Sequence, residues 1–217
     1  MRKKEKVLVF CAHSDDQAIG AGGTLSKYAA EGKEITIVVF SFGEQSGPVM
    51  LLRRRFSASL RVKESQKAAK ILGAKKTIFF GLKEGHFEEE FERKGLGRTV
   101  QKLISKQPSR IFTHAPDDLH PDHLAVHKII MNAVDELHST SEVYTFNIWS
   151  PLHPKNINQP RIYVDISHNF SQKMRALDCF QSQKLAFVLP FLMCIFFNFL
   201  DGLSNNCLFA ERFYKVH

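Results

Sequence analysis

Short runs of apolar residues recur along the chain, and longer segments with apolar residues three or four positions apart lie between them. Most of the runs are continuous rather than alternating in polarity, which is typical of strands covered on both faces. The segments between them have the period of amphipathic helices. This pattern predicts strands at residues 7–11, 35–40, 77–80, 110–113, 143–148 and 162–165, and helices at residues 24–31, 51–72, 96–106 and 123–137.

The alternation of strands and helices favours an α/β fold of the Rossmann-like type, with a mostly parallel sheet and helices on both faces. A chain of 217 residues is long enough to bury a substantial core, and neither a repeat nor a clear linker divides it. We therefore expect one domain over residues 1–217. In such sheets the functional site lies at the carboxyl ends of the strands.

The region of residues 185–206 differs from the rest of the chain. Its first 16 residues, up to Leu200, are apolar except for Asn198 and include Pro190. A membrane-spanning helix needs about 20 such residues. We favour a buried helix or a contact between subunits over attachment to a membrane surface, which leaves both a homo-oligomer and a membrane-surface contact open.

The formal net charge of +8 favours anionic partners but selects none of them. Many of the basic residues fall in residues 51–76, where an apolar stripe at helical spacing indicates an ordinary helix with a solvated face. We therefore expect no nucleic-acid partner. The four cysteines lie far apart and the first residues lack the layout of a signal peptide, so we expect a cytoplasmic protein.

A cluster of polar side chains follows the first predicted strand, in FCAHSDDQAIGAGG (residues 10–23). Its glycines do not match the dinucleotide-binding pattern, because that pattern would require a glycine where the chain has Leu25. They instead favour a helix that starts close to the sheet. Taken alone, His13 would be a core or capping residue, and Asp15 or Asp16 would cap a helix.

A second cluster, THAPDDLHPDHLAVH (residues 113–127), also follows an apolar run and leads into a predicted helix with Pro121 near its start. His120, His123 and His127 are spaced three and four positions apart, which places side chains on one face of a helix. If both clusters lie at the carboxyl ends of parallel strands, they converge on one point. Two imidazoles and one carboxylate around an open coordination position form a catalytic zinc arrangement, and such ligands also suit iron, cobalt or nickel.

The two clusters resemble the motifs of the LmbE-like de-N-acetylases, also called the PIG-L family, which are zinc hydrolases that remove an acetyl group from N-acetylated sugars. The family motifs A-H-P-D-D-E and H-x-D-H correspond here to AHSDDQ (residues 12–17) and HPDH (residues 120–123). The stretches AGGTLSKYAAEGKEITIVVFSFGE, RVKESQKAAKILGAKKTIFFGLKEG, ALDCFQSQ and AERF also look like family signatures in the expected order. Residues 185–206 lack a clear counterpart.

The resemblance implies that His13, Asp16 and His123 bind Zn²⁺, that Asp15 is the general base, and that protonated His120 stabilises the oxyanion. Zinc lowers the pKa of bound water to about 7, so a neighbouring carboxylate can accept its proton near neutrality. Removing one preorganised oxyanion donor typically costs about 10² to 10³ in rate.

Four further residues have other expected roles, or alternative ones, around the proposed metal ligands and catalytic residues. Asp122 would orient a histidine, with a plain aspartate at a helix N-terminus as the alternative. The resemblance implies that Arg61 contacts substrate hydroxyls, and a surface salt bridge to Glu64 is the alternative. His127 could replace His123 as the ligand, which the resemblance disfavours, and we expect His114 and the remaining histidines to be structural or exposed.

Two positions depart from the family pattern: Ser14 replaces a proline and Gln17 replaces a glutamate. The second change removes a charge, so activity or metal preference could differ. The sequence predicts a zinc-dependent N-deacetylase whose partner is a small N-acetylglucosamine-type sugar or glycoconjugate, with acetate and an amine as products. A metal amidase acting on a non-sugar acyl amine and a catalytically idle sugar-binding module are the alternatives.

Overall fold

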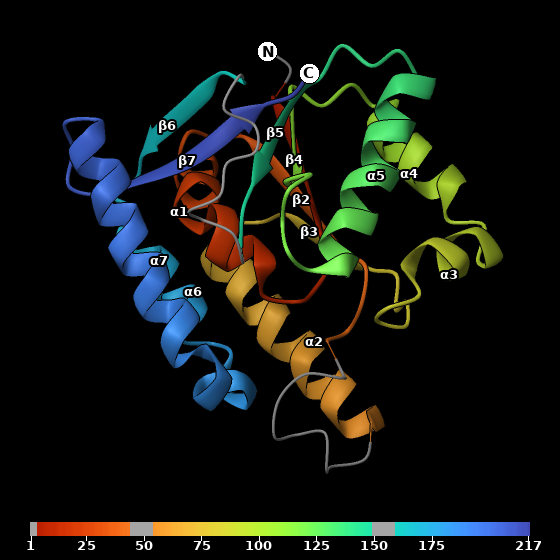
Figure 1. The fold of residues 1–217 in the computed structure, drawn as a ribbon, viewed down its shortest axis with the longest axis horizontal. Coiled ribbons are helices and arrows are strands. Elements are labelled where there is room, and N and C mark those ends of the chain that lie inside the picture. The colour runs from red at the N-terminus through yellow and green to blue at the C-terminus, as the bar shows by residue number, and fades with distance from the viewer. Residues whose placement is uncertain (1–3, 44–53, 149–158) are drawn as a thin grey trace.

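The computed structural model describes residues 4–43, 54–148 and 159–217, which build one seven-stranded sheet (Figure 1). The strands are β1 (Lys6–Cys11), β2 (Glu34–Val39), β3 (Lys76–Phe79), β4 (Arg110–His114), β5 (Glu142–Phe146), β6 (Arg161–Asp165) and β7 (Ala210–Lys215). Their order across the sheet is β3-β2-β1-β4-β5-β7-β6. The first five strands of this order pair in parallel, whereas β7 runs antiparallel to both β5 and β6.

Helices cover both faces of the sheet (Figure 1). One face carries α1 (Asp16–Ala30), α2 (Arg54–Ile71), α6 (Phe170–Leu177) and α7 (Lys184–Ser204), and the other carries α3 (Phe87–Arg93), α4 (Gly97–Ile104) and α5 (Pro121–Glu136). Successive residues of β1 enter the two cores in turn, with Val7 and Val9 in one and Leu8 and Phe10 in the other. Because both faces are covered, the central strands are continuous apolar runs.

The predicted α/β class with a mostly parallel sheet is confirmed, and all six predicted strands are present. The seventh strand, β7, and the helices α3 and α6 were not predicted. The strand expected to reach residue 148 ends at Phe146, because the N–H of Ile148 donates to Asp118 Oδ2 (3.0 Å) instead of continuing the sheet. Residues 51–53 of the expected helix 51–72 lie outside the described residues.

The glycines after β1 lie inside α1 rather than at its start, which corrects the expected helix boundary of residue 24 to Asp16. A Cβ atom on Gly20 would lie 2.4 Å from Phe146, and one on Gly23 would lie 2.6 Å from Ile166. Glycine is therefore required where α1 passes the end of β5 and the residue after β6. The expected close approach of helix and sheet is present.

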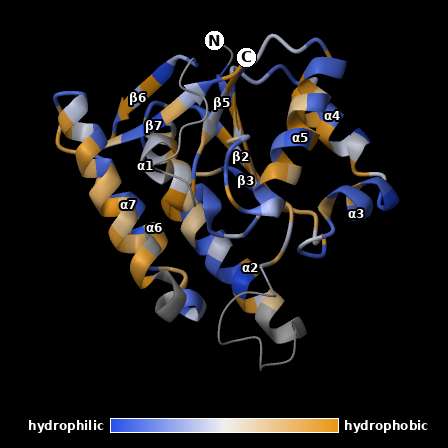
Figure 2. Cartoon of the chain, viewed as in Figure 1, coloured by the Kyte–Doolittle hydropathy of each residue, from blue (hydrophilic) through white to orange (hydrophobic). Residues whose placement is uncertain are grey.

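The apolar tail forms α7, which packs on the outer part of the sheet (Figure 2). Cys194, Asn198 and Asp201 are buried against the rest of the protein, while the opposite side of the helix keeps large apolar side chains in solvent. Within the described residues, no helix has the length and apolar character that crossing a bilayer requires. The tail is thus a helix that is buried on one face only.

Candidate metal centre

The site lies at the carboxyl ends of β1 and β4, which are neighbours at the centre of the sheet. The chain leaves β1 at Cys11 and enters α1 at Asp16, and it leaves β4 at His114 and enters α5 at Pro121. Because the two strands are parallel, both turns reach the same edge of the sheet. Two segments more than 100 positions apart in the chain therefore meet there.

Three of the predicted ligands converge at this edge: ligand atoms of His13, Asp16 and His123 lie within 4.8 Å of one another. His13 Nδ1 is 3.3 Å from His123 Nε2. Asp16 Oδ2 is 3.6 Å from His13 Nδ1, and Asp16 Oδ1 is 3.6 Å from His123 Nε2. All three residues are buried. We call this set the donor cluster; two imidazoles and one carboxylate are the donor types of a catalytic divalent-metal site.

Each histidine of the donor cluster has a second carboxylate on its other ring nitrogen. His13 Nε2 lies 3.2 Å from Asp122 Oδ2, and His123 Nδ1 lies 3.0 Å from Asp118 Oδ1. Carboxylates in this position orient metal-binding histidines and raise their basicity. They leave His13 Nδ1 and His123 Nε2 facing each other beside Asp16, so the residues fit a bound cation.

These contacts shift the pKa values of His13 and Asp118. Burial lowers the pKa of His13, but its contacts with Asp122 and Asp16 outweigh this effect and raise the pKa to about 10. Burial raises the pKa of Asp118, yet the bond to His123 holds it down at about 2. A cation that binds at His13 Nδ1 therefore has to displace a proton.

Asp15 lies outside the donor cluster. It precedes α1 but makes no side-chain cap, and its Oδ2 accepts a hydrogen bond from Arg61 Nη2 at 3.0 Å. Arg61 is only 2% exposed, and its Nε and Nη1 have no hydrogen-bond partner among the described residues. The alternative of a surface pair between Arg61 and Glu64 is wrong, because Glu64 accepts hydrogen bonds from Ser182 instead.

His120 lies at the N-terminus of α5, half-buried at the rim of the cluster. Its Nδ1 accepts a hydrogen bond from the N–H of Asp122 (3.2 Å), so the ring proton is on Nε2. Its ring centroid is 4.8 Å from those of His13 and His123. Burial and these two histidines lower the pKa of His120. The structure therefore favours a neutral His120 that donates from Nε2, rather than the protonated form that we expected.

Two residues of this site escaped the sequence analysis. His114, expected to be structural, is buried with its Nε2 3.2 Å from Asp16 Oδ2, and its ring stacks on that of His123 at 3.9 Å. Burial lowers its pKa to about 4, so it is neutral at pH 7. Asp118, whose Oδ1 lies 3.0 Å from His123 Nδ1, is the second residue that the sequence analysis missed. By contrast, His127 bonds through Nδ1 to the carbonyl of His114 (2.8 Å) and not to the cluster.

A third segment, after β3, reaches the cluster through Asp122. The second carboxylate oxygen of Asp122 accepts a hydrogen bond from the N–H of Gly85 (2.8 Å). The preceding Glu84 accepts a hydrogen bond from Ser41 Oγ (3.0 Å), and burial raises its pKa. Asp122 thus joins the loop after β3 to His13. The sequence analysis expected Asp122 to orient a histidine, and His13 is the histidine that it contacts.

The two departures from the family motif lie next to the cluster but do not enter it. The side-chain amide of Gln17 donates to the carbonyl of Ser14 (2.8 Å) and lies 3.3 Å from Ser65 Oγ on α2. Both Ser14 and Gln17 are buried. Gln17 therefore holds the turn after β1 against α2 without contributing charge near the metal ligands.

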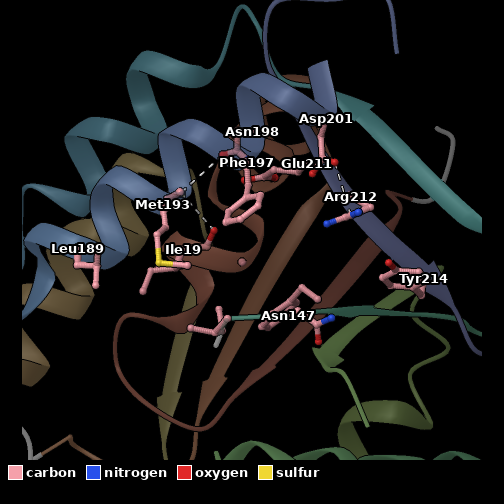
Figure 3. Close-up of a pocket in the computed structure, with 14 residues that line it drawn as sticks. Ile19, Asn147, Leu189, Met193, Phe197, Asn198, Asp201, Glu211, Arg212 and Tyr214 are labelled. Carbon is pink, nitrogen blue, oxygen red and sulfur yellow. Dashed lines mark hydrogen bonds and ion pairs between the residues drawn. The ribbon is translucent and has the colours of Figure 1, made fainter. Parts of the chain in front are cut away.

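A pocket lies beside the site, between α1, α7 and β7 (Figure 3). Met193 and Phe197 of α7 form part of its wall, and Asn147 lies across from them. Phe146 also lines this pocket, and its ring centroid is 4.9 Å from that of His114. Phe146 is thus shared between the pocket and the surroundings of the donor cluster.

Comparison with known proteins identifies related sequences and structures. The family model described as PIG-L, GlcNAc-PI de-N-acetylase, matches residues 8–134. A probable N-acetyl-alpha-D-glucosaminyl L-malate deacetylase 2 from Bacillus anthracis is 26% identical over 219 residues, with 98% of this chain and 94% of the relative covered. A 4-oxalmesaconate hydratase from Pseudomonas putida is 28% identical over 199 residues, with 83% and 75% covered. The structure of N,N'-diacetylchitobiose deacetylase from Pyrococcus horikoshii has the same fold, with a TM-score of 0.83 at 21% identity, covering 99% of this chain and 85% of that chain.

Proposed function

The chain belongs to the family of GlcNAc-PI de-N-acetylases (PIG-L), and from this premise we propose that it removes the N-acetyl group from an N-acetylglucosamine-type sugar or conjugate by metal-dependent hydrolysis. The products are acetate and a free amine. One observation carries the proposal: of the two adjacent aspartates, Asp16 lies in the donor cluster and Asp15 lies outside it on Arg61. One carboxylate can thus bind the metal while the other moves protons.

We assign the metal to His13 Nδ1, His123 Nε2 and Asp16, with Zn²⁺ as the ion and another divalent metal as the alternative. Bound there, the ion supplies Lewis acidity that makes water a better nucleophile near neutral pH. Asp122 and Asp118 orient the two imidazoles through their other ring nitrogens, His13 Nε2 and His123 Nδ1.

Asp15 acts as the general base. The hydrogen bond from Arg61 fixes the direction of its carboxylate and so limits the positions from which it can accept a proton. It takes the proton of the attacking water and returns it to the leaving amine, because breaking the amide bond requires a protonated nitrogen. Arg61 is then a positioning residue, and we propose that its remaining donors, Nε and Nη1, bind substrate hydroxyls.

His120 stabilises the negative charge that develops on the carbonyl oxygen. Its Nδ1 is held by the N–H of Asp122, so the Nε2–H is the donor that remains for the substrate. A neutral donor already in place costs no reorganisation during the reaction. The lowered pKa of His120 is consistent with this role.

Three alternatives remain to be separated from this function. A metal amidase for a non-sugar acyl amine would use the same residues, and an idle sugar-binding module would keep the pocket without turnover. The relative named as a hydratase adds a third, because hydration of a carbon–carbon double bond also needs an activated water and a base.

One assay separates all four. Acetate release is measured from N-acetylglucosamine, its L-malate conjugate and diacetylchitobiose, with a non-sugar N-acetyl amine and 4-oxalmesaconate as comparison substrates. We expect acetate from at least one sugar, loss of activity with a chelator, recovery with Zn²⁺, and no activity in Asp15→Ala. Turnover of the non-sugar amide alone, hydration without acetate, or tight sugar binding without turnover would each replace the proposal with the corresponding alternative.

A further inference from the structure

The outer side of α7 carries a row of exposed apolar side chains that the proposed reaction does not use. Leu189, Leu192, Phe196 and Leu203 are each more than half exposed, and Leu200 is 39% exposed. Their spacing of three and four positions places them on one face of the helix. We call these five residues the α7 stripe.

The spacing of the α7 stripe is symmetric about Phe196: the four leucines lie four and seven positions before it and after it. If a second α7 is laid antiparallel across the first with a two-fold axis at Phe196, Leu192 of one copy meets Leu200 of the other. Leu189 meets Leu203 in the same way, and the two Phe196 rings meet at the axis. A two-fold interface requires such self-complementarity. We propose that two copies of this chain associate through antiparallel α7 helices with Phe196 at the axis.

The charges on α7 agree with a protein partner. Among its described side chains Asp201 is the charged one, and it is buried and lies 3.6 Å from Arg212. The five residues of the α7 stripe therefore include no charged side chain. A helix that lies on a membrane surface instead carries several Lys and Arg residues beside its apolar face. Lys184, the first residue of α7, is the single basic residue of this helix, and it precedes Leu189 by five positions.

The apolar area also agrees with a dimer. Together with the flanking Val188 and Phe199, the stripe exposes on the order of 600 Å² of apolar side chain, given about 150–250 Å² for a whole aromatic residue. This area is at the upper end of the roughly 300–600 Å² of the largest apolar patch on a typical monomer, and such patches are often functional. A standard interface buries roughly 800 Å² per partner. The α7 stripe, its two flanking residues and a surrounding polar rim can together supply an area of this size.

A hollow beside the N-terminal half of α7 supplies a place for a side chain of the second copy. Its lining comes from α6, the following turn and α7: the apolar Leu177, Phe180, Val188, Phe191 and Leu192, and the polar Asp178 and Gln181. In the antiparallel arrangement the C-terminal end of the second helix lies over this hollow, so Leu203 of the partner subunit is placed to enter it. This assignment does not depend on the proposed reaction.

Sedimentation velocity of the full chain at micromolar concentration is the first test. We expect twice the mass of the chain for the parent protein and the mass of one chain for Phe196→Glu, since that change places two carboxylates against each other at the axis. Leu124→Glu is the control, because Leu124 is also an exposed apolar residue (39%) and lies on α5, on the other side of the sheet from α7 (Figure 1). Circular dichroism checks that both variants remain folded.

Disulfide cross-linking tests the antiparallel geometry itself. Under mild oxidation Phe196→Cys should cross-link with itself, and Leu189→Cys should cross-link with Leu203→Cys when the two variants are mixed. Leu189→Cys alone should not, because the two copies of residue 189 lie about 20 Å apart along the helices. The parent chain, with its four native cysteines, gives the baseline.

Three results would overturn the proposal. A parent protein that stays monomeric at high micromolar concentration excludes the dimer. If this monomer binds vesicles of phosphatidylcholine and phosphatidylglycerol, and Phe196→Glu abolishes that binding, the α7 stripe is a membrane-binding surface instead. A dimer that persists in Phe196→Glu, or a Leu189→Cys variant that cross-links with itself, would place the interface elsewhere or make it parallel.

Discussion

Two adjacent aspartates after β1 point to different partners, and this difference can be measured. Asp16 lies in the donor cluster, whereas Asp15 accepts a hydrogen bond from Arg61. We expect Asp15→Asn to keep its metal and to lose about 10² to 10⁴ in kcat, the usual contribution of a general base. Asp16→Asn should instead lose the metal. Metal content after dialysis and the rate of acetate release check both variants, and equal metal loss in the two would contradict the assignment.

The raised pKa of His13 gives metal binding a pH dependence. With a pKa of about 10, His13 holds a proton at pH 7 that a metal at Nδ1 must displace. Protons compete with the metal, so affinity should fall roughly tenfold for each pH unit that the pH drops below this pKa. Calorimetric titration with Zn²⁺ in buffers of different ionisation enthalpy should report about one proton released by this residue. The heat of binding would be the same in all buffers if His13 were neutral beforehand.

The sequence was sufficient to find the residues that the two motifs contain. The expected parallel strands brought the two clusters to one edge of the sheet, and the family resemblance selected His13, Asp16 and His123 within them. His114 was missed although it ends β4, and that position was a usable signal. The pairing of Asp15 with Arg61 could not be predicted, because it joins residues 46 positions apart through the packing of α2.

At the scale of elements, one buried ion pair joins three segments that are distant in the chain. Lys173 of α6 is fully buried, with Nζ 2.6 Å from Glu211 of β7 and 2.8 Å from the carbonyl of Ile19 in α1. Glu211 in turn accepts hydrogen bonds from the N–H groups of Gly23 and Thr24. This pair therefore connects α1, α6 and β7.

We expect Lys173→Met to lower the free energy of unfolding by about 3–5 kcal/mol, because it leaves Glu211 charged and buried without its cation. Lys75→Met is the control: Lys75 is 2.6 Å from Glu34, but its side chain is 66% exposed. Breaking an exposed pair of this kind costs about 1 kcal/mol or less. Urea unfolding of the two variants gives the comparison, and similar losses would show that Lys173 and Glu211 do not join the segments.

The same ion pair explains why the sequence analysis missed two elements, β7 and α6. Most of the predicted strands are continuous apolar runs, whereas β7 contains the buried Glu211, whose charge is paired with Lys173. In α6 the buried Lys173 interrupts the apolar stripe. In a sequence, a charged residue that is buried in an ion pair cannot be distinguished from a charged surface residue. The hydrophobic pattern alone therefore could not identify β7 and α6.

At the scale of the whole molecule, the donor cluster connects parts of the chain that are far apart in the sequence. His13 and Asp16 follow β1, while His123 lies in α5, 110 positions after His13. A metal held by all three can bind only when both turns are in place. Metal binding and folding are therefore coupled.

A metal that binds the folded chain and not the unfolded one should raise its stability by mass action. At a free Zn²⁺ concentration 100 times the Kd, the gain is about 2.7 kcal/mol, which for a chain of this length raises Tm by roughly 5–10 °C. Differential scanning calorimetry with and without Zn²⁺ measures the shift. His123→Ala should lose the shift because it removes a ligand, and Asp15→Asn should keep it because its side chain lies on Arg61. An equal rise in Tm for the parent chain and His123→Ala would place the stabilising metal outside the donor cluster.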